Sequence, residues 1–160
     1  MEGRRSCWSD QPGPSVEVIR RDGFKDHLRI RAHRTLRRLS MSKIVVVDDS
    51  YAELQLIESC LKGASHTVVS YPSSDKLEDK VAIEKPDLIV LDVVMPGRNG
   101  FQTCRDLKND DRCKNIPIIL CTSKGNESDK FWGQQQGANG YIVKPFKAED
   151  LLTAVKKVMG

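Results

Sequence analysis

Charged or hydroxyl side chains directly follow four short apolar runs of the sequence. Asp48 and Asp49 come after KIVVV, and Asp92 comes after LIVL. Thr122 follows IPIILC, and Lys144 follows YIV. Three carboxylates held together in a partly dry crevice repel one another, and a divalent cation relieves this repulsion. Because the ligands are oxygens, with no histidine or cysteine among them, they favour Mg²⁺.

The lysine and the threonine suit a phosphoryl group. Its oxygens need a cation and a hydrogen-bond donor, which Lys144 and Thr122 would supply. Taken alone, Asp48 and Asp49 would more commonly belong to a solvated turn after a strand. Their expected convergence with Asp92 and Lys144 favours a site that holds Mg²⁺ and a phosphoryl group.

Five strands must bring these side chains together. From Lys43 onward, short β-branched apolar runs alternate with longer segments of helical spacing, a pattern typical of βα units around a parallel sheet. Strands are expected over residues 44–47, 67–70, 88–91, 116–121 and 140–143. The first, third and fourth are nearly all apolar, which predicts the sheet centre. Ligands bind at the carboxyl ends of such strands, so the polar residues above should meet there.

Helical signals follow each expected strand. Ser50 and Glu53 have capping-box spacing, and Gly63 should end the first helix. Phe131 is predicted to lie on the inner side of the fourth helix, and Trp132 beside it is expected to pack. The second helix is expected over about 74–84, and the third from near 99–100. The fourth should follow residue 126, and the fifth should cover about 148–159.

The composition indicates one folded domain with a tail. The chain has 160 residues, of which 39% are hydrophobic and 30% are charged, enough for one buried core. No run approaches the roughly 20 apolar residues of a membrane span, and no secretory signal opens the chain, so a cytoplasmic location is expected. The five cysteines form no C-x-x-C pair and are interpreted as reduced thiols.

Residues 1–40 differ from the rest in charge. They hold ten Lys or Arg and five acids, which leaves 16 basic and 17 acidic residues of the totals of 26 and 22 for residues 41–160. A basic stretch over 25–38 could form an amphipathic helix that binds nucleic acid or an anionic membrane surface. A flexible extension without a fixed partner is favoured. A targeting peptide would also fit these residues, and so would a natural translation start at Met41.

Four strings, in this order and spacing, are highly specific together. KIVVVDDS, DLIVLDVVMPGRNG, IPIILCTS and GANGYIVKPF resemble the CheY-like response-regulator receiver family, from Lys43 to about Met159. The resemblance implies a flavodoxin-like (βα)5 fold, a doubly wound parallel five-stranded sheet in strand order 2-1-3-4-5. It also implies phosphorylation by a histidine kinase or phosphotransfer protein. The string DKFWGQQQGA resembles single-domain regulators of type IV pilus twitching motility and phototaxis.

The same resemblance implies a role for each matching residue. Asp92 would be the phosphoacceptor, whose carboxylate attacks phosphorus in line to give an acyl phosphate that water later hydrolyses. Asp49 would bind Mg²⁺ directly, and Asp48 would hold it mainly through water. The backbone carbonyl of Val94 would complete the protein ligands. The chain would thus be a self-catalysed phosphoacceptor with slow autodephosphorylation, not an enzyme.

The resemblance further implies how a signal would leave the site. Thr122 would move toward the phosphoryl group, Lys144 would pair with it, and Tyr141 would turn inward on activation. This rearrangement would change the face made by the fourth helix, fifth strand and fifth helix, where a downstream protein would bind. A cis peptide bond is expected before Pro145.

Three functions fit parts of the sequence. The favoured one is a stand-alone switch acting by protein contact, because Gly160 follows the last helix directly and leaves no room for an output domain. The second is a nucleic-acid-binding regulator that uses the basic tail. The third is a phosphatase of a related aspartate-nucleophile fold, which would want an acid at position 94, where valine stands.

Overall fold

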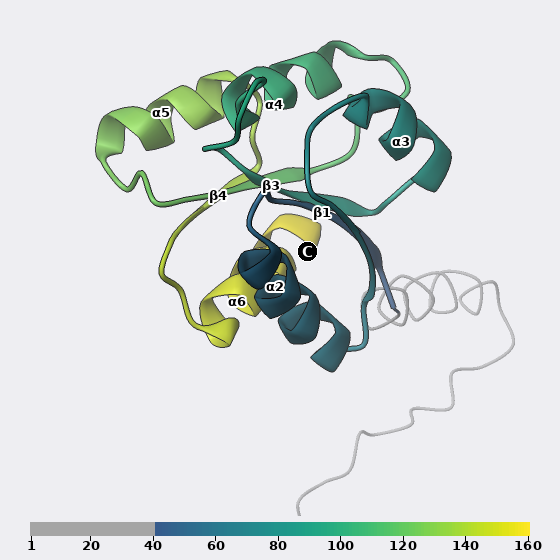
Figure 1. The fold of residues 1–160 in the computed structure, drawn as a ribbon, viewed down its shortest axis with the longest axis vertical. Helices are drawn as coiled ribbons and strands as arrows, with labels where there is room; N and C mark the ends of the chain where they lie inside the picture. Colours follow the sequence, from purple (N-terminus) through teal and green to yellow (C-terminus); the bar gives the residue numbers. More distant parts are fainter. Residues whose placement is uncertain (1–40) are drawn as a thin grey trace, which may run out of the picture. The chain divides into compact units, whose positions relative to one another are not determined.

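Five parallel strands form the sheet of the computed structural model, which describes residues 41–160 (Figure 1). They are β1 (Lys43–Val47), β2 (Thr67–Tyr71), β3 (Leu88–Asp92), β4 (Ile118–Thr122) and β5 (Gly140–Val143). Their order is β2-β1-β3-β4-β5, which confirms the predicted strand order and the flavodoxin-like fold. β4 begins two residues later than expected, because Pro117 has no N–H to donate to the ladder.

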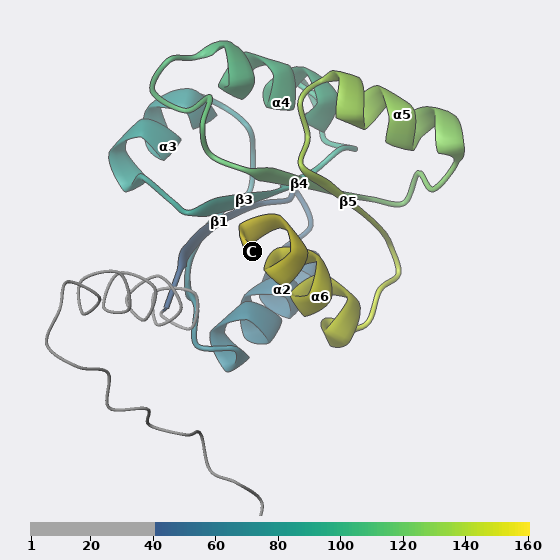
Figure 2. The same cartoon turned by 180° about the vertical axis from the view of Figure 1, so that it is seen from behind.

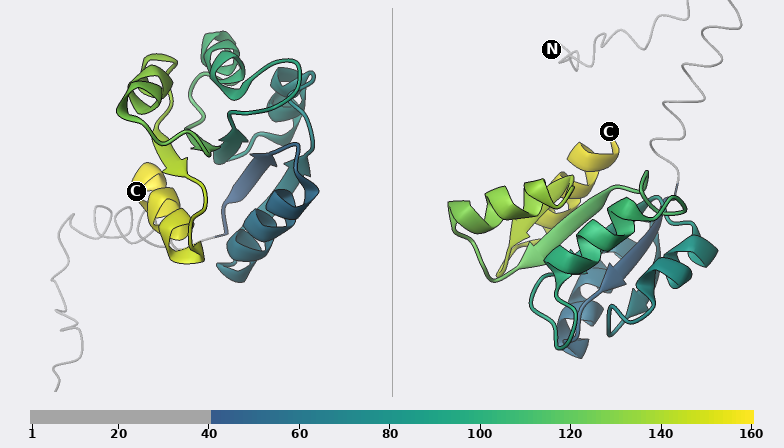
Figure 3. Two further views of the ribbon diagram at one scale, coloured as in Figure 1. Left: turned by 60° about the vertical axis from the view of Figure 1, so that its left-hand side comes forward. Right: turned by 90° about the horizontal axis from the view of Figure 1, so that it is seen from above.

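Helices cover both faces of the sheet. The structure places α2 (Tyr51–Gly63) and α6 (Ala148–Met159) on one face. The other face carries α3 (Leu77–Glu84), α4 (Gly100–Asn109) and α5 (Glu127–Gln135), as the view from behind also shows (Figure 2). Seen from above, these three helices lie side by side over the strands (Figure 3). The result is three layers, with the sheet in the middle.

Two buried apolar clusters hold the layers together. On one face, Leu77 of α3 and Phe101 and Leu107 of α4 pack over the central strands. On the other face, Ile57 of α2 and Leu151 of α6 pack against the same strands. All residues of β3 and β4 are buried, as strands covered on both faces should be. Two of the strands whose carboxyl ends carry the polar groups are therefore the most buried strands of the sheet.

Side-chain caps set the helix starts that the sequence predicted. The side chain of Ser50 accepts a hydrogen bond from the Glu53 N–H, which caps α2. Asn99 caps α4 and Asn126 caps α5 in the same way, through the N–H groups three residues on. α3 starts at Leu77 instead of about residue 74, because the backbone preceding it is left-handed at residue 76.

The prediction for Phe131 was wrong, and Trp132 does not pack inside either. The two residues are 60% and 52% exposed. The inner position of α5 belongs to Gly133, where an added Cβ would lie 3.0 Å from Leu120 Cδ1 and 3.2 Å from the Tyr141 ring. Residues one and two positions earlier point roughly 100° and 200° away from that side of a helix. Both aromatic side chains therefore face outward.

Three other expectations concern the cysteines, membrane spans and residues 1–40. Cys60, Cys104, Cys113 and Cys121 are free thiols. In residues 41–160, none of the helices combines the length and the apolarity that crossing a membrane requires. The predictions for residues 1–40, including the amphipathic helix over 25–38, and for Cys7 lie outside the described residues.

Candidate functional site

Acidic residues meet where the sheet reverses its strand order. From β1 the chain passes to β2 on one side and later to β3 on the other, so the carboxyl ends of β1 and β3 border a crevice. Asp48 and Asp49 directly follow β1, and Asp92 is the last residue of β3. Each of the three acids offers one carboxylate oxygen, and these three oxygens lie within 4.8 Å of one another. The expected cluster of three acids is therefore present.

The three acids differ in their surroundings. Asp48 and Asp92 are buried, whereas Asp49 is exposed. One oxygen of Asp48 accepts a hydrogen bond from the Ser50 N–H at 2.9 Å, at the start of α2. Two buried carboxylates and one exposed one leave an open side from which a cation can approach.

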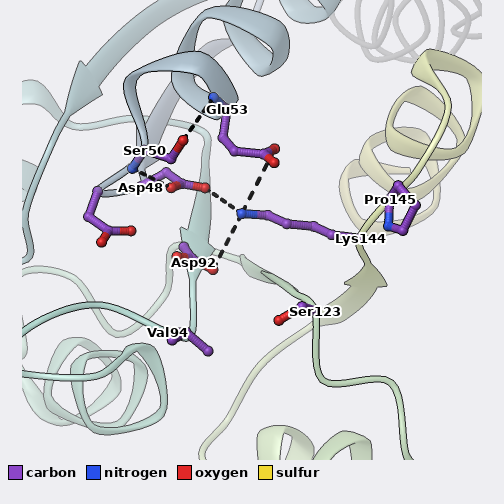
Figure 4. A pocket seen from close by; sticks show the side chains of 9 residues that line it. Asp48, Ser50, Glu53, Asp92, Val94, Ser123, Lys144 and Pro145 are labelled. Atoms are coloured by element: carbon purple, nitrogen blue, oxygen red, sulfur yellow. Dashed lines mark hydrogen bonds and ion pairs between the residues drawn. The ribbon is translucent and has the colours of Figure 1, made fainter.

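Lys144, which follows β5, reaches across to these acids (Figure 4). Its Nζ lies 2.6 Å from Asp48 Oδ2 and 3.5 Å from Asp92 Oδ1. A fourth acid, Glu53 of α2, has a carboxylate oxygen 3.9 Å from the same Nζ. Burial lowers the pKa of Lys144, but the hydrogen bond to Asp48 and the charge of Asp92 outweigh it, so the net pKa is raised. The ammonium therefore stays charged.

The carboxyl group of Asp92 has an unusual proton affinity. Burial first, and then the charge of Asp48, raise its pKa to about 6, although Lys144 opposes this shift. The backbone amide of Val94 also opposes the shift, because it favours the ionised carboxylate. The remaining repulsion is what a hard cation would relieve, and every ligand that the cluster offers is an oxygen. The residues present therefore fit Mg²⁺.

An open pocket of about 450 Å³ surrounds the cluster. The residues that line it come from the ends of β1, β3, β4 and β5 and from the start of α2: Asp48, Asp49, Ser50, Glu53, Asp92, Val94, Ser123, Lys144 and Pro145. A pocket with this acidic floor and one ammonium can accept a metal ion together with an anionic group.

Comparison with known proteins agrees with this geometry. The sequence matches the family described as response regulator receiver domain over residues 44–156, more than half of the chain. The chain belongs to the response regulator receiver family.

Relatives of this receiver domain include both short and long proteins. Protein PilH of Pseudomonas aeruginosa is 40% identical over 122 residues, which cover 74% of this chain and 98% of PilH. The phosphate regulon transcriptional regulatory protein PhoB of the same species is 35% identical over 116 residues, 72% of this chain but only 51% of PhoB. The chemotaxis response regulator CheY4 of Vibrio cholerae superposes with a TM-score of 0.70 at 30% identity, covering 74% of this chain and 99% of CheY4.

Membership of the family carries general expectations. Receiver domains bind Mg²⁺ at an acidic pocket, and this one has a cluster of Asp48, Asp49 and Asp92. Receiver domains are typically phosphoacceptors, and they interact with a kinase or phosphotransfer protein and with downstream targets.

Thr122 and Tyr141 meet at the loop after β4 of the receiver domain. Thr122 is fully buried, and its hydroxyl accepts a hydrogen bond from the Lys124 N–H at 3.2 Å. The hydroxyl of Tyr141 donates to the Lys124 carbonyl at 2.6 Å. Thr122 does not line the pocket, whereas its neighbour Ser123 does. The predicted cis peptide bond before Pro145 is confirmed.

Sequence reasoning missed Glu53 and Ser123 as pocket residues. Glu53 could have been found, because it lies in the first turn of a helix that begins just after two of the acids. No sequence pattern marked Ser123 as a pocket residue. Its place in the lining depends on how the chain turns after β4, which the local sequence does not reveal. Val94 was predicted only from the family resemblance, and it does line the pocket, half exposed.

Proposed function

We propose that this receiver domain is a phosphorylation switch in which Asp92 accepts a phosphoryl group from a histidine kinase or a phosphotransfer protein. One observation carries the proposal: Asp92 lies within 4.8 Å of two further acids and 3.5 Å from the Lys144 ammonium. An ion pair that only stabilised the fold would not need three acids near one lysine. Asp48, Asp49, Asp92 and the carbonyl of Val94 would hold Mg²⁺, which when bound would neutralise their charge and that of the phosphoryl oxygens.

In the transfer step, a carboxylate oxygen of Asp92 attacks phosphorus. A new P–O bond to Asp92 forms as the bond from phosphorus to the donor breaks, and the donor leaves with that electron pair. The Lys144 ammonium would shift toward the transferred oxygens, since Asp92 Oδ1 is already 3.5 Å away. Asp48 keeps Lys144 in place until then through its 2.6 Å contact. The chain would act on itself and would not be an enzyme for a separate substrate.

The signal would pass through the loop after β4. A phosphoryl group adds roughly two negative charges, which would attract the Thr122 hydroxyl away from the Lys124 N–H. Because Tyr141 is bonded to the carbonyl of the same Lys124, a shift of the loop changes the position of its ring. The population of loop conformations would change, but the fold would not.

The face of α5, β5 and α6 would bind the downstream protein. Phe131 and Trp132 of α5 and Val143 of β5 are exposed apolar residues on these elements. Exposed apolar side chains of this kind are available for contact with a partner. The identity to Protein PilH over 98% of that protein supports a stand-alone regulator of pilus-based motility or phototaxis. The expected cytoplasmic location stays a prediction.

Phosphorylation by a small donor tests this function directly. The full chain is incubated with acetyl phosphate and Mg²⁺, and its intact mass is measured. We expect the mass of one phosphoryl group to be added, and this gain to disappear in Asp92→Asn and when EDTA removes the metal. Asp111→Asn is the matched control, because Asp111 is 89% exposed and pairs only with Lys114 among the ion pairs of the described residues. A gain that persists in Asp92→Asn would refute the assignment.

A further inference from the structure

The loop that follows Asp92 is held in place along its length. It covers residues 93–99, between β3 and α4. At its start, the Val93 N–H donates to the Cys121 carbonyl at 3.3 Å, and the Val93 carbonyl accepts from the Gly100 N–H at 2.9 Å. Gly97 turns the loop with a positive φ of 76°, which favours glycine. The side chain that anchors the far part of the loop is Arg98.

Arg98 ties the loop to α3 and α4 through its guanidinium. Nη1 and Nη2 bind the two carboxylate oxygens of Glu78 at 2.6 and 3.1 Å, a bidentate pair. Nη1 also lies 3.2 Å from Asp106 of α4, and Nη2 donates to the Ser74 carbonyl at 2.8 Å. In return, the buried Ser74 hydroxyl donates to the Arg98 carbonyl at 3.0 Å. Both the side chain and the backbone of Arg98 are therefore fixed.

This anchor is four residues from Val94, a pocket residue two positions after the phosphoacceptor. Val94 lines the pocket, and its backbone amide limits the rise in the pKa of Asp92. The carbonyl of Val94 is the backbone ligand in the proposed metal site. The loop is short, and hydrogen bonds hold it near both ends. If Arg98 were free to move, Val94 would therefore move as well. A metal ligand that is oriented by an outer contact binds more tightly than one that must first be ordered.

We propose that Arg98 is a positioning residue of the phosphoacceptor site, which holds the loop 93–99 against α3 and thereby sets the place of Val94 before the metal binds. The inference rests on the proposed function, because it concerns the same Asp92 site. Arg98 would touch neither the metal nor the phosphoryl group. Its side chain is 26% exposed and that of Glu78 is 19% exposed, so solvent screens this pair less than a surface pair.

Arg112 provides a matched control within the same pair of helices. It pairs with Asp79 of α3 at 3.0 Å and with Asp110, the C-cap of α4, at 2.7 Å. It therefore links α3 to α4 as Arg98 does, but it lies outside the loop 93–99 and is 54% exposed. An effect of Arg98 that Arg112 lacks must come from the loop and not from the contact between the helices.

The experiment compares the unaltered full chain with Arg98→Met, Arg98→Lys and Arg112→Met. Calorimetric titration gives the Mg²⁺ dissociation constant, and hydrogen exchange by NMR in metal-free buffer gives the exchange rate of the Val94 amide. We expect Arg98→Met to weaken Mg²⁺ binding roughly tenfold, the low end for outer-shell contacts, and to speed Val94 exchange. Arg98→Lys should recover part of both effects, because it keeps the charge but loses the bidentate geometry. Arg112→Met should change neither by more than about twofold.

The outcomes separate this inference from the function on which it rests. If the unaltered chain does not bind Mg²⁺, the proposed function fails, and the inference fails with it. If the unaltered chain binds Mg²⁺ and Arg98→Met binds it equally well, only the inference is overturned. Exchange that speeds equally at Val94 and at the amides of β1 would indicate general destabilisation and would also overturn it. Should Arg98→Met not fold, Arg98→Lys decides between the same outcomes.

Discussion

The negative charge on Asp92 destabilises the folded state when no metal is bound. The pKa of this carboxyl is raised to about 6 by burial and by the neighbouring Asp48, and Lys144 compensates only in part. In an unfolded chain, an aspartate has a pKa of about 3.9. The folded protein therefore binds a proton more readily than the unfolded one between these two values. A residue kept in such a place at a cost in stability is typical of functional sites.

The stability effect of Asp92 should depend on pH in a defined direction. Because the folded-state pKa is raised, the free energy of unfolding falls as pH rises from about 4 to about 6. Asp92→Asn, which cannot ionise, should therefore stabilise the metal-free protein at pH 8, by up to about 3 kcal/mol for a shift of two units. At pH 4 the difference should nearly vanish. Urea denaturation in EDTA at both values of pH measures it.

A surface aspartate serves as the reference for this measurement. Asp111→Asn should leave the free energy of unfolding nearly unchanged at both values of pH, since Asp111 is 89% exposed. If Asp92→Asn were equally stabilising at pH 4 and at pH 8, the effect would not arise from ionisation of Asp92.

At the scale of elements, β3 and the start of α4 approach so closely that no side chain would fit at position 100. A Cβ placed on Gly100, the first residue of α4, would lie 2.2 Å from the Asp92 carbonyl oxygen and 2.7 Å from Val93 Cα. Both are backbone atoms, which cannot turn aside as a side chain can. The absence of a Cβ thus lets α4 start directly against the end of the strand that carries the phosphoacceptor.

Gly100→Ala should therefore destabilise the domain and disturb the site. We expect a loss of about 2 kcal/mol or more in the free energy of unfolding, as for overpacked cores, and slower reaction with acetyl phosphate. Gly63→Ala is the matched control, because nothing lies within 4 Å of its Cβ position at the end of α2. It should raise the free energy of unfolding by a few tenths to about 1 kcal/mol. Equal effects of the two substitutions would contradict the close approach of α4.

At the scale of the whole molecule, the charge is unevenly distributed along the chain. Residues 41–160 carry 16 basic and 17 acidic side chains, whereas residues 1–40 carry ten basic and five acidic ones. The receiver domain itself therefore has no excess of positive charge for nucleic acid, and any such binding would require the first forty residues.

Removal of residues 1–40 separates phosphorylation from nucleic-acid binding. We expect the chain from Met41 onward to fold and to react with acetyl phosphate at a rate within about twofold of the full chain, because the site comes entirely from later residues. Rates are followed by intact mass, and DNA binding by both chains is measured at several salt concentrations. Binding by the full chain that weakens steeply with salt, and is lost on truncation, would favour a nucleic-acid-binding regulator.

Much of the fold and part of the site could be predicted from local patterns. The apolar strands, the cap at Ser50 and the helix starts near residues 99–100 and after residue 126 are confirmed, because each depends on neighbouring residues. The strand order is confirmed as well, but it was implied by the family resemblance and not by local patterns. The outward direction of Phe131 could not be predicted, since α5 has nine residues and its hydrophobic positions do not define one face.

The local sequence was enough to show that acids follow β1 and end β3 and that a lysine follows β5, and parallel strands bring such ends to one edge. Packing in three dimensions adds further groups that the sequence did not reveal: Glu53 beside Lys144, Ser123 in the pocket lining, and Arg98 between α3 and α4. The reason is physical. The order of residues fixes which elements form, but contacts between residues that lie far apart in the chain depend on how those elements pack against one another.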